Sequence, residues 1–191
     1  MKKILLVALL LIPFFGFSQT TKPIDGFLGI KFGSSKAVVL AAIRAKGGVV
    51  DKANSNLTQI AFNNVKLGHR LTSGFLVRFV NDKACNALFV FSTTPEDKTI
   101  DYYNDLLNDI NDIYGSGEST KTFRTPFKDG DGYEITAIKE GDADYITNWN
   151  SGKNSIQMSI NTDLMVKLTY FDGVLTDMRD AQKKAKESSD F

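Results

Sequence analysis

Phe75-Leu76-Val77-Arg78-Phe79-Val80, then Asn81-Asp82-Lys83, then Ala84-Cys85-Asn86-Ala87-Leu88-Phe89-Val90-Phe91, is the stretch of sequence that decides the fold. Aromatic and β-branched residues favour strands, and Asn and Asp favour the turn between them. The stretch therefore predicts an antiparallel hairpin. Its strands are apolar at nearly every position except Arg78 and Asn86, as expected of strands buried on both faces or of a sheet face used for association.

The sequence before this hairpin predicts further strands and one short helix. From Thr58 onward Ile60 and Phe62 alternate with polar neighbours, which indicates β-structure through to Phe91. Gly26–Phe32 predicts an earlier strand. Residues 35–46 carry apolar side chains at helical spacing, with the Ser35 hydroxyl as N-cap and Gly47-Gly48 as the stop.

The sequence after the hairpin predicts a longer helix. Thr94-Pro95-Glu96-Asp97 has a capping hydroxyl, a proline and acids in the order of a helix start. One apolar stripe then runs to Gly115, and its members are Ile100, Tyr103, Leu107, Ile110 and Tyr114.

Beyond this helix we expect a loop at 115–125 and then four strands: Tyr133–Lys139, Asp144–Asn150, Ser155–Asn161 and Met165–Phe171. In the third of these strands Ile156 and Met158 face one way and Gln157 and Ser159 the other, which predicts a sheet packed on one side and wet on the other. Asp177–Phe191 is polar and charged, and we expect a frayed helix or a disordered tail there.

The order of these elements predicts an α+β fold. We expect two similar units, each a short helix followed by an antiparallel β-meander, with the helices packed on one sheet face. The predicted divisions are 1–18, a signal peptide; 19–93, the first unit; 94–176, the second unit; and 177–191, a polar tail. Whether the two units share one sheet or form two stays open.

This element order, with the opening Leu28-Gly29-Ile30-Lys31-Phe32-Gly33-Ser34-Ser35-Lys36, resembles the secreted β-lactamase-inhibitor-protein-like fold. Members of that fold carry tandem units of helical segments on a four-stranded antiparallel sheet. The resemblance spans residues 27–175. Ala37-Val38 stands where this entry usually continues with acids. The resemblance implies a non-enzymatic binder in the bacterial envelope or outside the cell, and it transfers no functional residue.

The first 18 residues predict export. Met1-Lys2-Lys3 is a positive start, and Ile4–Phe15 is an apolar run interrupted only by Pro13. Small residues in Gly16-Phe17-Ser18 suit cleavage after Ser18, which would make Gln19 the first mature residue. The alternative is an uncleaved anchor, but the run is shorter than the roughly 18 residues that cross a bilayer. We expect a periplasmic or extracellular protein with no membrane span after cleavage.

Composition excludes several classes of function. The chain has 23 basic and 22 acidic residues, and this near-balance argues against the clustered basic face that nucleic-acid binders need. Cys85 is the single cysteine, so no internal disulfide is possible. In its strand-like run Cys85 is expected to be a buried thiol, and a reactive or intermolecular thiol is the alternative.

Candidate catalytic and metal-binding residues do not assemble into a known pattern. His69 is the single histidine, and Ser73 lies close to it without an acid partner. Glu140, Asp142 and Asp144 could pair on a strand, but Gly141 indicates an exposed turn instead. Asp129, Asp131 and Glu140 match only part of a calcium loop. We predict no metal, no cofactor and no enzymatic activity.

Tyr145 and Trp149 share one side of a predicted strand and could form an exposed aromatic platform, although aromatics at this spacing are more often core. The sequence thus favours an exported protein-interaction module with an unknown protein partner. The alternative is a small-ligand or glycan binder that uses Tyr145 and Trp149. A hydrolase that uses His69 or the carboxylates is the third hypothesis.

Overall fold

The computed structural model describes residues 22–189. The predicted signal peptide, residues 1–18, and its cleavage point lie outside the described residues. No helix of the described range is long and apolar enough to cross a membrane.

The chain is α+β, as predicted from the sequence. The helices are α1 (Lys36–Ala45), α2 (Thr99–Tyr114), α3 (Glu134–Glu140) and α4 (Gly173–Ser189), with a 3-10 turn, η2 (Glu96–Lys98), directly before α2. The main-sheet strands are β3 (Val49–Asn56), β4 (Gln59–Asn63), β7 (Gly74–Val80), β8 (Lys83–Phe91), β9 (Glu118–Phe123), β10 (Ala143–Ser151), β11 (Asn154–Ile160) and β12 (Val166–Phe171). Two small hairpins pair β1 (Gly26–Phe27) with β2 (Ile30–Lys31) and β5 (Lys66–Leu67) with β6 (Arg70–Leu71).

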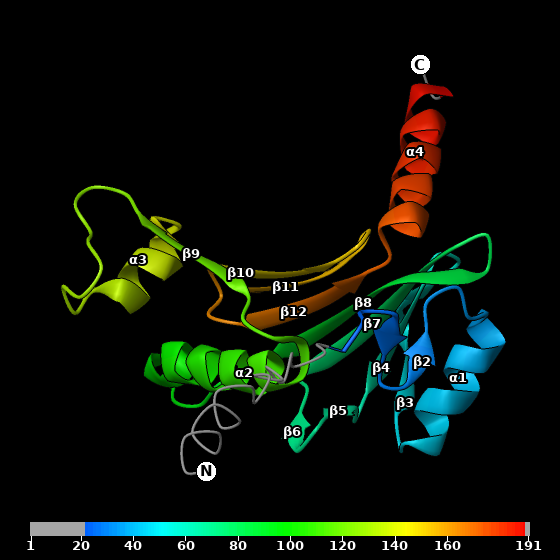
Figure 1. Ribbon diagram of the computed structural model, residues 1–191, viewed down its shortest axis with the longest axis horizontal. Coiled ribbons are helices and arrows are strands. Elements are labelled where there is room, and N and C mark those ends of the chain that lie inside the picture. The colour runs from blue at the N-terminus through cyan, green and yellow to red at the C-terminus, as the bar shows by residue number, and fades with distance from the viewer. Residues whose placement is uncertain (1–21, 190–191) are drawn as a thin grey trace, which may run out of the picture.

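One continuous antiparallel sheet contains all eight main strands, in the order β3-β4-β7-β8-β12-β11-β10-β9. Strands from the first and second halves of the chain meet at its centre, where β8 pairs with β12 and Leu88 faces Thr169. The question of one sheet or two is therefore answered in favour of one. Helices α1 and α2 lie on the same side of this sheet, and α4 extends away on the other side (Figure 1).

The hairpin that decides the fold forms as predicted, with β7 and β8 joined by Asn81 and Asp82 at positive φ. It is not buried equally on both faces, however. Phe75, Val77 and Phe79 point into the core, and Leu76 between them is half-buried on the opposite face. A shift of register between Arg78 and Phe79 inserts an extra residue into β8. Strand β8 therefore alternates on both sides of a local irregularity.

A run of aromatic rings forms the centre of the core between the sheet and the helices. Phe75 lies at the middle of this run, with ring centroids 5.8 Å from Phe62 and 4.5 Å from Phe89. Phe89 in turn contacts the ring of Tyr170 edge-on at 5.7 Å. Because Tyr170 is on β12 and Phe89 is on β8, these rings hold the two halves of the sheet together.

The two predicted helices form close to their expected bounds. At the start of α1 the Ser35 hydroxyl accepts a hydrogen bond from the backbone N–H of Val38 at 3.4 Å. In α2 the stripe is shifted slightly, because Leu106 is fully buried and Leu107 only partly. The sequence Thr94–Asp97 leads into η2 before α2 begins at Thr99.

Several segments differ from their sequence-based predictions, among them Gly26–Phe32, which was expected to be one strand and forms the β1–β2 hairpin. Residues 133–139 were expected to form a strand, but Glu134–Glu140 is helix α3, which buries Ala137 and Ile138 and ends at Gly141 in the left-handed conformation. The expected loop at 115–125 contains edge strand β9, which pairs with β10. The polar segment from Asp177, expected to be a frayed helix or a disordered tail, is helical through Ser189. It belongs to α4, which starts at Gly173, where the Asp172 carboxylate accepts the backbone N–H of Leu175 at 2.8 Å.

Candidate binding surface

Strand β10 shows which side chains point to each face of the sheet. Tyr145 and Thr147 point toward α2: the Tyr103 ring meets the Tyr145 ring edge-on, and the Tyr103 and Thr147 hydroxyls lie 2.7 Å apart. Side chains alternate along a strand, so Ile146 and Asn148 point to the other face. We call that other face, opposite α1 and α2, the open face.

Cross-strand pairing carries one row of side chains over the whole open face. Directly opposed residues of antiparallel strands point to the same side, so the row can be followed from pair to pair. It consists of Glu118, Asn148, Gln157, Thr169, Leu88, Leu76, Ala61 and Asp51, in order from β9 to β3. A parallel row consists of Thr120, Ile146, Ser159, Lys167, Val90 and Gly74.

The open face has a polar part and an apolar part. On β9, β10 and β11 its side chains are hydroxyls, amides and acids except for Ile146, and the Gln157 amide donates to the Asn148 amide oxygen at 3.1 Å. On β8 and β7 the row changes to Leu88, Val90 and Leu76, which are all half-buried. The apolar part thus lies on the strands of the first half of the sheet.

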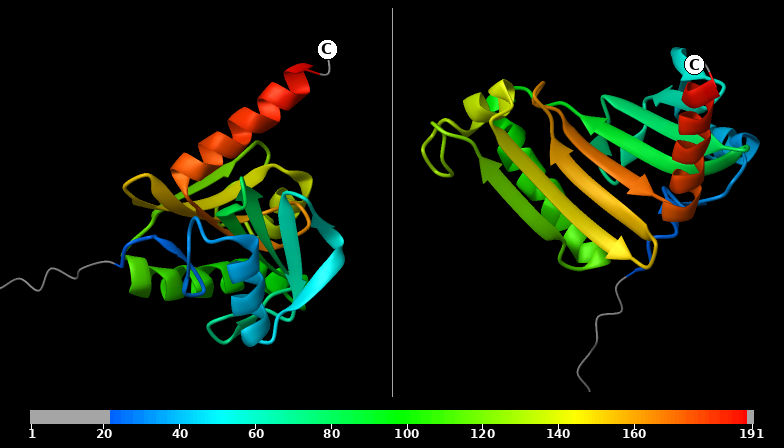
Figure 2. Two further views of the ribbon diagram at one scale, coloured as in Figure 1. Left: turned by 90° about the vertical axis from the view of Figure 1, so that its right-hand side faces the viewer. Right: turned by 90° about the horizontal axis from the view of Figure 1, so that it is seen from above.

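Among residues 22–189, no helix covers the open face over β10, β11 and β12. The view from above shows these strands facing the viewer, with α2 behind them and α4 standing upright to one side (Figure 2). Helix α3 lies at the far end of the sheet, against β10. The uncovered area therefore lies between α3 and α4.

The exposed aromatic platform predicted for Tyr145 and Trp149 is wrong in its geometry. Both residues point toward α2, and their exposed fractions are 2 % and 3 %. The Trp149 indole N–H donates to the Asn111 side-chain oxygen at 2.9 Å and to the Gly115 carbonyl at 3.0 Å. These partners explain why the ring turns inward. Whether either residue binds a ligand stays a prediction.

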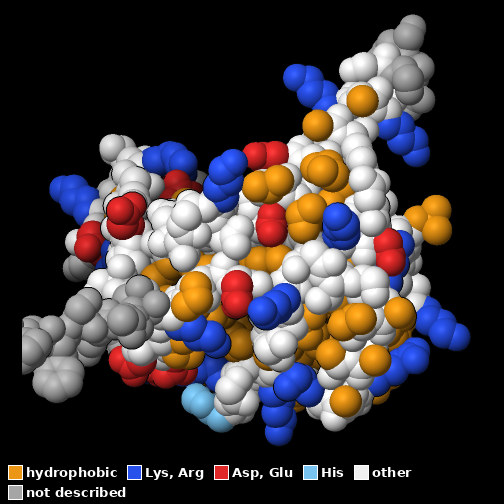
Figure 3. Space-filling model, turned by 45° about the vertical axis from the view of Figure 1, so that its right-hand side comes forward, with side chains coloured by type: hydrophobic (Ala, Val, Ile, Leu, Met, Phe, Trp, Pro, Cys, Tyr) orange, Lys and Arg blue, Asp and Glu red, His pale blue; other side chains and the backbone are white. Residues whose placement is uncertain are grey.

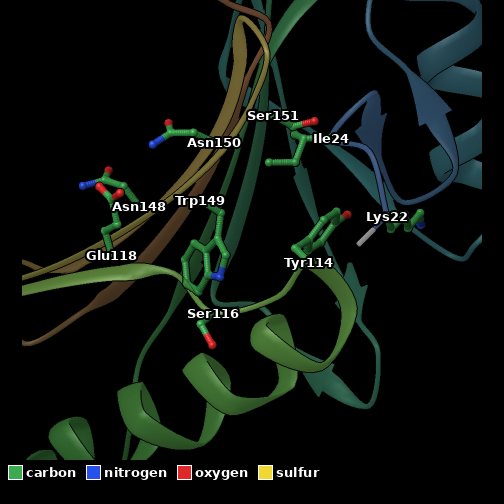
Figure 4. Close-up of a pocket in the computed structure, with 9 residues that line it drawn as sticks. All are labelled: Lys22, Ile24, Tyr114, Ser116, Glu118, Asn148, Trp149, Asn150 and Ser151. Carbon is green, nitrogen blue, oxygen red and sulfur yellow. The ribbon is translucent and has the colours of Figure 1, made fainter. Parts of the chain in front are cut away.

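Trp149 does line one small pocket, in which its ring points toward the last turn of α2 (Figure 4). The pocket volume is about 190 Å³, below the several hundred Å³ typical of small-molecule sites. Its lining residues are Lys22, Ile24, Tyr114, Ser116, Glu118, Asn148, Trp149, Asn150 and Ser151.

Within residues 22–189, the hydrogen bonds of the candidate catalytic residues go to other groups and not to one another. His69 is exposed in the turn between β5 and β6, while the Ser73 hydroxyl donates to the Val90 carbonyl at 3.0 Å. Asp144 accepts from Thr122 and pairs with Arg124, each at 3.0 Å. Gly141, expected in a hairpin turn, is the C-cap of α3.

The partial calcium loop is held by hydrogen bonds from its backbone N–H groups to the carboxylates of Asp131 and Glu134. Asp131 accepts the backbone N–H groups of Lys128 and Tyr133, both at 2.8 Å, and Glu134 accepts that of Gly130 at 2.8 Å. These are the bonds of an Asx-type turn that leads into α3. Within residues 22–189 no group of three or more His, Cys, Asp or Glu side chains is placed to hold a metal ion.

Cys85 occupies the register shift in β8. Its side chain is fully buried, and its thiol donates to the Arg78 carbonyl at 3.3 Å. Burial raises the pKa of the Cys85 thiol. This environment is that of a structural thiol.

The sequence predicted that one side of β11 is exposed to solvent. It did not predict that this exposed side continues over the neighbouring strands as the open face. The alternation in Ser155–Asn161 indicated one exposed side, and Gln157 and Ser159 do point outward. The continuation of that side over β12 and β8 depends on pairing between residues about eighty positions apart, for which the sequence gives no local signal.

Comparisons of the chain with protein-family models, with curated proteins and with solved structures found no match.

Proposed function

We propose that this chain is an exported, non-enzymatic binding protein that holds a protein partner against the open face. One observation carries the proposal: half-buried apolar side chains on β7 and β8 adjoin a field of hydroxyl and amide side chains on β9 to β11. An apolar centre beside hydrogen-bonding side chains is the usual composition of a protein–protein interface.

The contacts expected at this surface follow from its rows. A partner's apolar side chains would pack on Leu76, Leu88 and Val90, and its polar groups would bond to Asn148 and Gln157. A sheet presents such side chains on a rigid surface, so little conformational entropy is lost on binding.

Site-directed photo-cross-linking tests this proposal. A photoreactive amino acid at Thr169, in the middle of the open face, should capture one specific protein in cells that produce the chain. The matched control places the same probe at Asp105, which is exposed on α2 on the other side of the sheet. We expect no capture of that protein from position 105.

Two substitutions then separate specific binding from adventitious capture. Leu88→Arg places a charge in the apolar part of the open face and should abolish cross-linking from position 169. Ile113→Arg changes an apolar residue that is 47 % exposed on α2 and should leave it unchanged. Equal capture from both probe positions, or capture that survives Leu88→Arg in folded protein, would refute the proposal.

Export is proposed from residues 1–18 alone, and it can be tested separately. We expect mass spectrometry of the protein isolated from its native cells to find an N-terminus at Gln19. An intact Met1 in the mature protein would contradict export by this route.

We also propose that residues 19–93 and 94–176 form two related units, as the resemblance to the β-lactamase-inhibitor-protein-like fold implies. The strand order supports this: from the centre outward it reads β8-β7-β4-β3 on one side and β12-β11-β10-β9 on the other. Each set of four follows one helix, α1 or α2, in the chain. Superposition of the two sets of strands should find an approximate two-fold rotation between them.

The ligand-binding alternative has less support from the geometry. Tyr145 and Trp149 are buried, and the Trp149 indole N–H already has two acceptors. If a glycan bound at the pocket beside Trp149, the fluorescence of this single tryptophan would change on titration. An unchanged spectrum over a broad glycan panel would remove this alternative.

A further inference from the structure

A cleft lies between α4, the turn that joins β7 to β8, and the tip that joins β3 to β4. Its volume is about 900 Å³, which is in the range of small-molecule sites. Residues of α4 form one wall, and Phe79, Val80 and Leu57 lie on the other side. We call it the basic cleft. Figure 3 shows α4 standing clear of the body above this region, with Lys and Arg side chains on both of its sides.

The basic cleft carries an excess of positive charge. Its acidic residues are Asp82 and Asp180, and its basic residues are Lys36, Arg78, Arg179, Lys183 and Lys186. The chain as a whole has a net charge of only +1, so positive charge is concentrated here. A cleft lined by one sign of charge attracts ligands of the opposite sign.

Two guanidinium groups lie at the base of this cleft. The first, on Arg78, donates to the Asn86 side-chain oxygen at 2.8 Å, and among the described residues it has no carboxylate within ion-pair distance. The second, on Arg179, binds Asp180 at 2.7 Å through Nη2. Burial, and then the charge of Arg179, lower the pKa of Arg78. The fold therefore holds two like charges near each other at a cost in free energy.

Two buried side-chain nitrogen atoms at this junction have no hydrogen-bond acceptor. They are Nδ2 of Asn86 and Nη1 of Arg179, and no other buried side-chain nitrogen or oxygen of residues 22–189 lacks a partner. Leaving such a donor without an acceptor costs about 1–3 kcal/mol, so proteins seldom do so without a reason. Both donors belong to the junction where Arg78 and Arg179 meet.

We propose that the basic cleft binds the phosphate group of a small molecule. The phosphate would lie between Arg78 and Arg179, whose planar groups can each offer paired N–H donors to its oxygens. Its negative charge would offset the repulsion between the two arginines. A modest rotation of the Arg179 side chain, which is 25 % exposed, would bring Nη1 to an oxygen.

The rest of the cleft suits the remainder of such a ligand. Lys183 on α4 lines the cleft with its side chain 75 % exposed. Its Nζ lies 3.8 Å from the Glu187 carboxylate, and an exposed pair of this kind contributes little, so an anionic ligand could compete for the ammonium group. Leu57, at the tip that joins β3 to β4, is 89 % exposed and offers apolar surface on the side of the cleft away from α4. Arg78 and Asn86 lie on the open face, two residues along from Leu76 and Leu88. Phosphate binding to the purified protein does not require the proposed protein partner, so the two proposals are tested separately.

Calorimetric titration of the purified protein with inorganic pyrophosphate tests the proposal. At about 0.15 M salt, where exposed charges are largely screened, we expect saturable binding with one site per chain. Arg78→Gln and Arg179→Gln should each weaken it by about tenfold or more, the loss expected for one charge-assisted hydrogen bond. Lys128→Gln, which removes the same charge from the exposed segment before α3, should leave binding unchanged.

A second variant guards against misfolding. Lys183→Glu reverses an exposed charge on α4 and is not expected to disturb folding, but it should weaken pyrophosphate binding. Absence of saturable binding, or binding equally strong in Arg179→Gln, Lys183→Glu and the unaltered protein, would overturn the proposal.

A parallel measurement separates a soluble phosphate compound from a lipid headgroup. The protein is mixed with vesicles of phosphatidylcholine that contain, or lack, phosphatidic acid. Co-sedimentation only with phosphatidic acid, lost in Arg78→Gln, would assign the phosphate to a lipid. Pyrophosphate binding without co-sedimentation would assign it to a soluble molecule.

Discussion

The hydroxyl groups of Tyr103 on α2 and Thr147 on β10 lie 2.7 Å apart, and both side chains are buried. The Thr147 hydroxyl also lies 2.8 Å from that of Ser119 on β9. Three hydroxyls thus satisfy one another where the helix meets the second half of the sheet. A buried polar network of this kind stabilises only while all of its members are present.

Thr147→Val should therefore destabilise the protein by roughly 1–3 kcal/mol, because it leaves the Tyr103 hydroxyl buried without its partner. Urea denaturation measures the change in the free energy of unfolding. Thr169→Val makes the same substitution on the open face and should change it by no more than about 0.5 kcal/mol. Similar losses in both variants would argue against the network. Adding Tyr103→Phe to Thr147→Val should cost less than the sum of the single changes.

Stability should fall in alkaline solution. Burial raises the pKa of Tyr145 to about 12, and burial also raises the pKa of Tyr103. The folded state then holds these protons more tightly than the unfolded state, whose tyrosines have a pKa near 10. The stability they provide is fully present below pH 10 and is lost as the pH rises toward 12. Denaturant titrations at several pH values should show this slope, and Tyr145→Phe should reduce it. Constant stability over this range would contradict the assignment.

Cys85 should react slowly with thiol reagents in the folded protein. Its side chain is buried, and burial raises the pKa of its thiol, so little reactive thiolate is available. In the folded protein, labelling of Cys85 with a chromogenic disulfide should be limited by the rate at which the structure around it opens. In urea, where the protein is unfolded, labelling should be immediate. A Ser92→Cys variant, with its extra thiol at an exposed position, should take up one equivalent immediately. Rapid labelling of the unaltered protein would favour the reactive-thiol alternative.

Gly117→Ala should disturb Trp149. A Cβ atom at position 117 would lie 2.6 Å from the Trp149 ring and 2.6 Å from the Thr147 methyl group. Overpacking of this kind costs typically 1–3 kcal/mol, and the fluorescence of the single tryptophan should change as its ring moves. Gly74→Ala is the matched control, because no atom lies within 4 Å of its added Cβ. An unchanged fluorescence spectrum for Gly117→Ala would contradict the expectation that the added methyl group displaces the Trp149 ring.

The sequence predicted the elements whose side chains alternate or repeat regularly. Ser155–Asn161 alternates strictly because one side packs on the core and the other meets water, and β11 matches it. The longer helix was predicted from one apolar stripe that packs on the sheet. In both cases one side of the element packs on the core, so its apolar residues recur at the spacing of a strand or of a helix.

The misassigned segments lack such a period. Strand β9 is an edge strand, polar at every position before Phe123, and only backbone pairing with β10 makes it β. Helix α3 has seven residues, too few to display a helical period, and its place depends on burying Ala137 and Ile138. For Trp149 the spacing left an exposed platform and a core position both open, and the ring turns inward because Asn111 and Gly115 accept its N–H. Arg78 and Arg179 are a hundred residues apart, so no local pattern could bring them together.

The pairing of β8 with β12 also governs how the chain reaches its folded state. Until residues 166–171 are available, β8 has a free hydrogen-bonding edge beside some of the most apolar side chains of the core. An unpaired apolar edge readily recruits other chains. The first half of the sheet therefore stays incomplete until β12 has been synthesised. A chain that ends before residue 166 is expected to aggregate. Pairing with β12 removes the free edge of β8 and leaves β3 and β9 as the edges of the sheet.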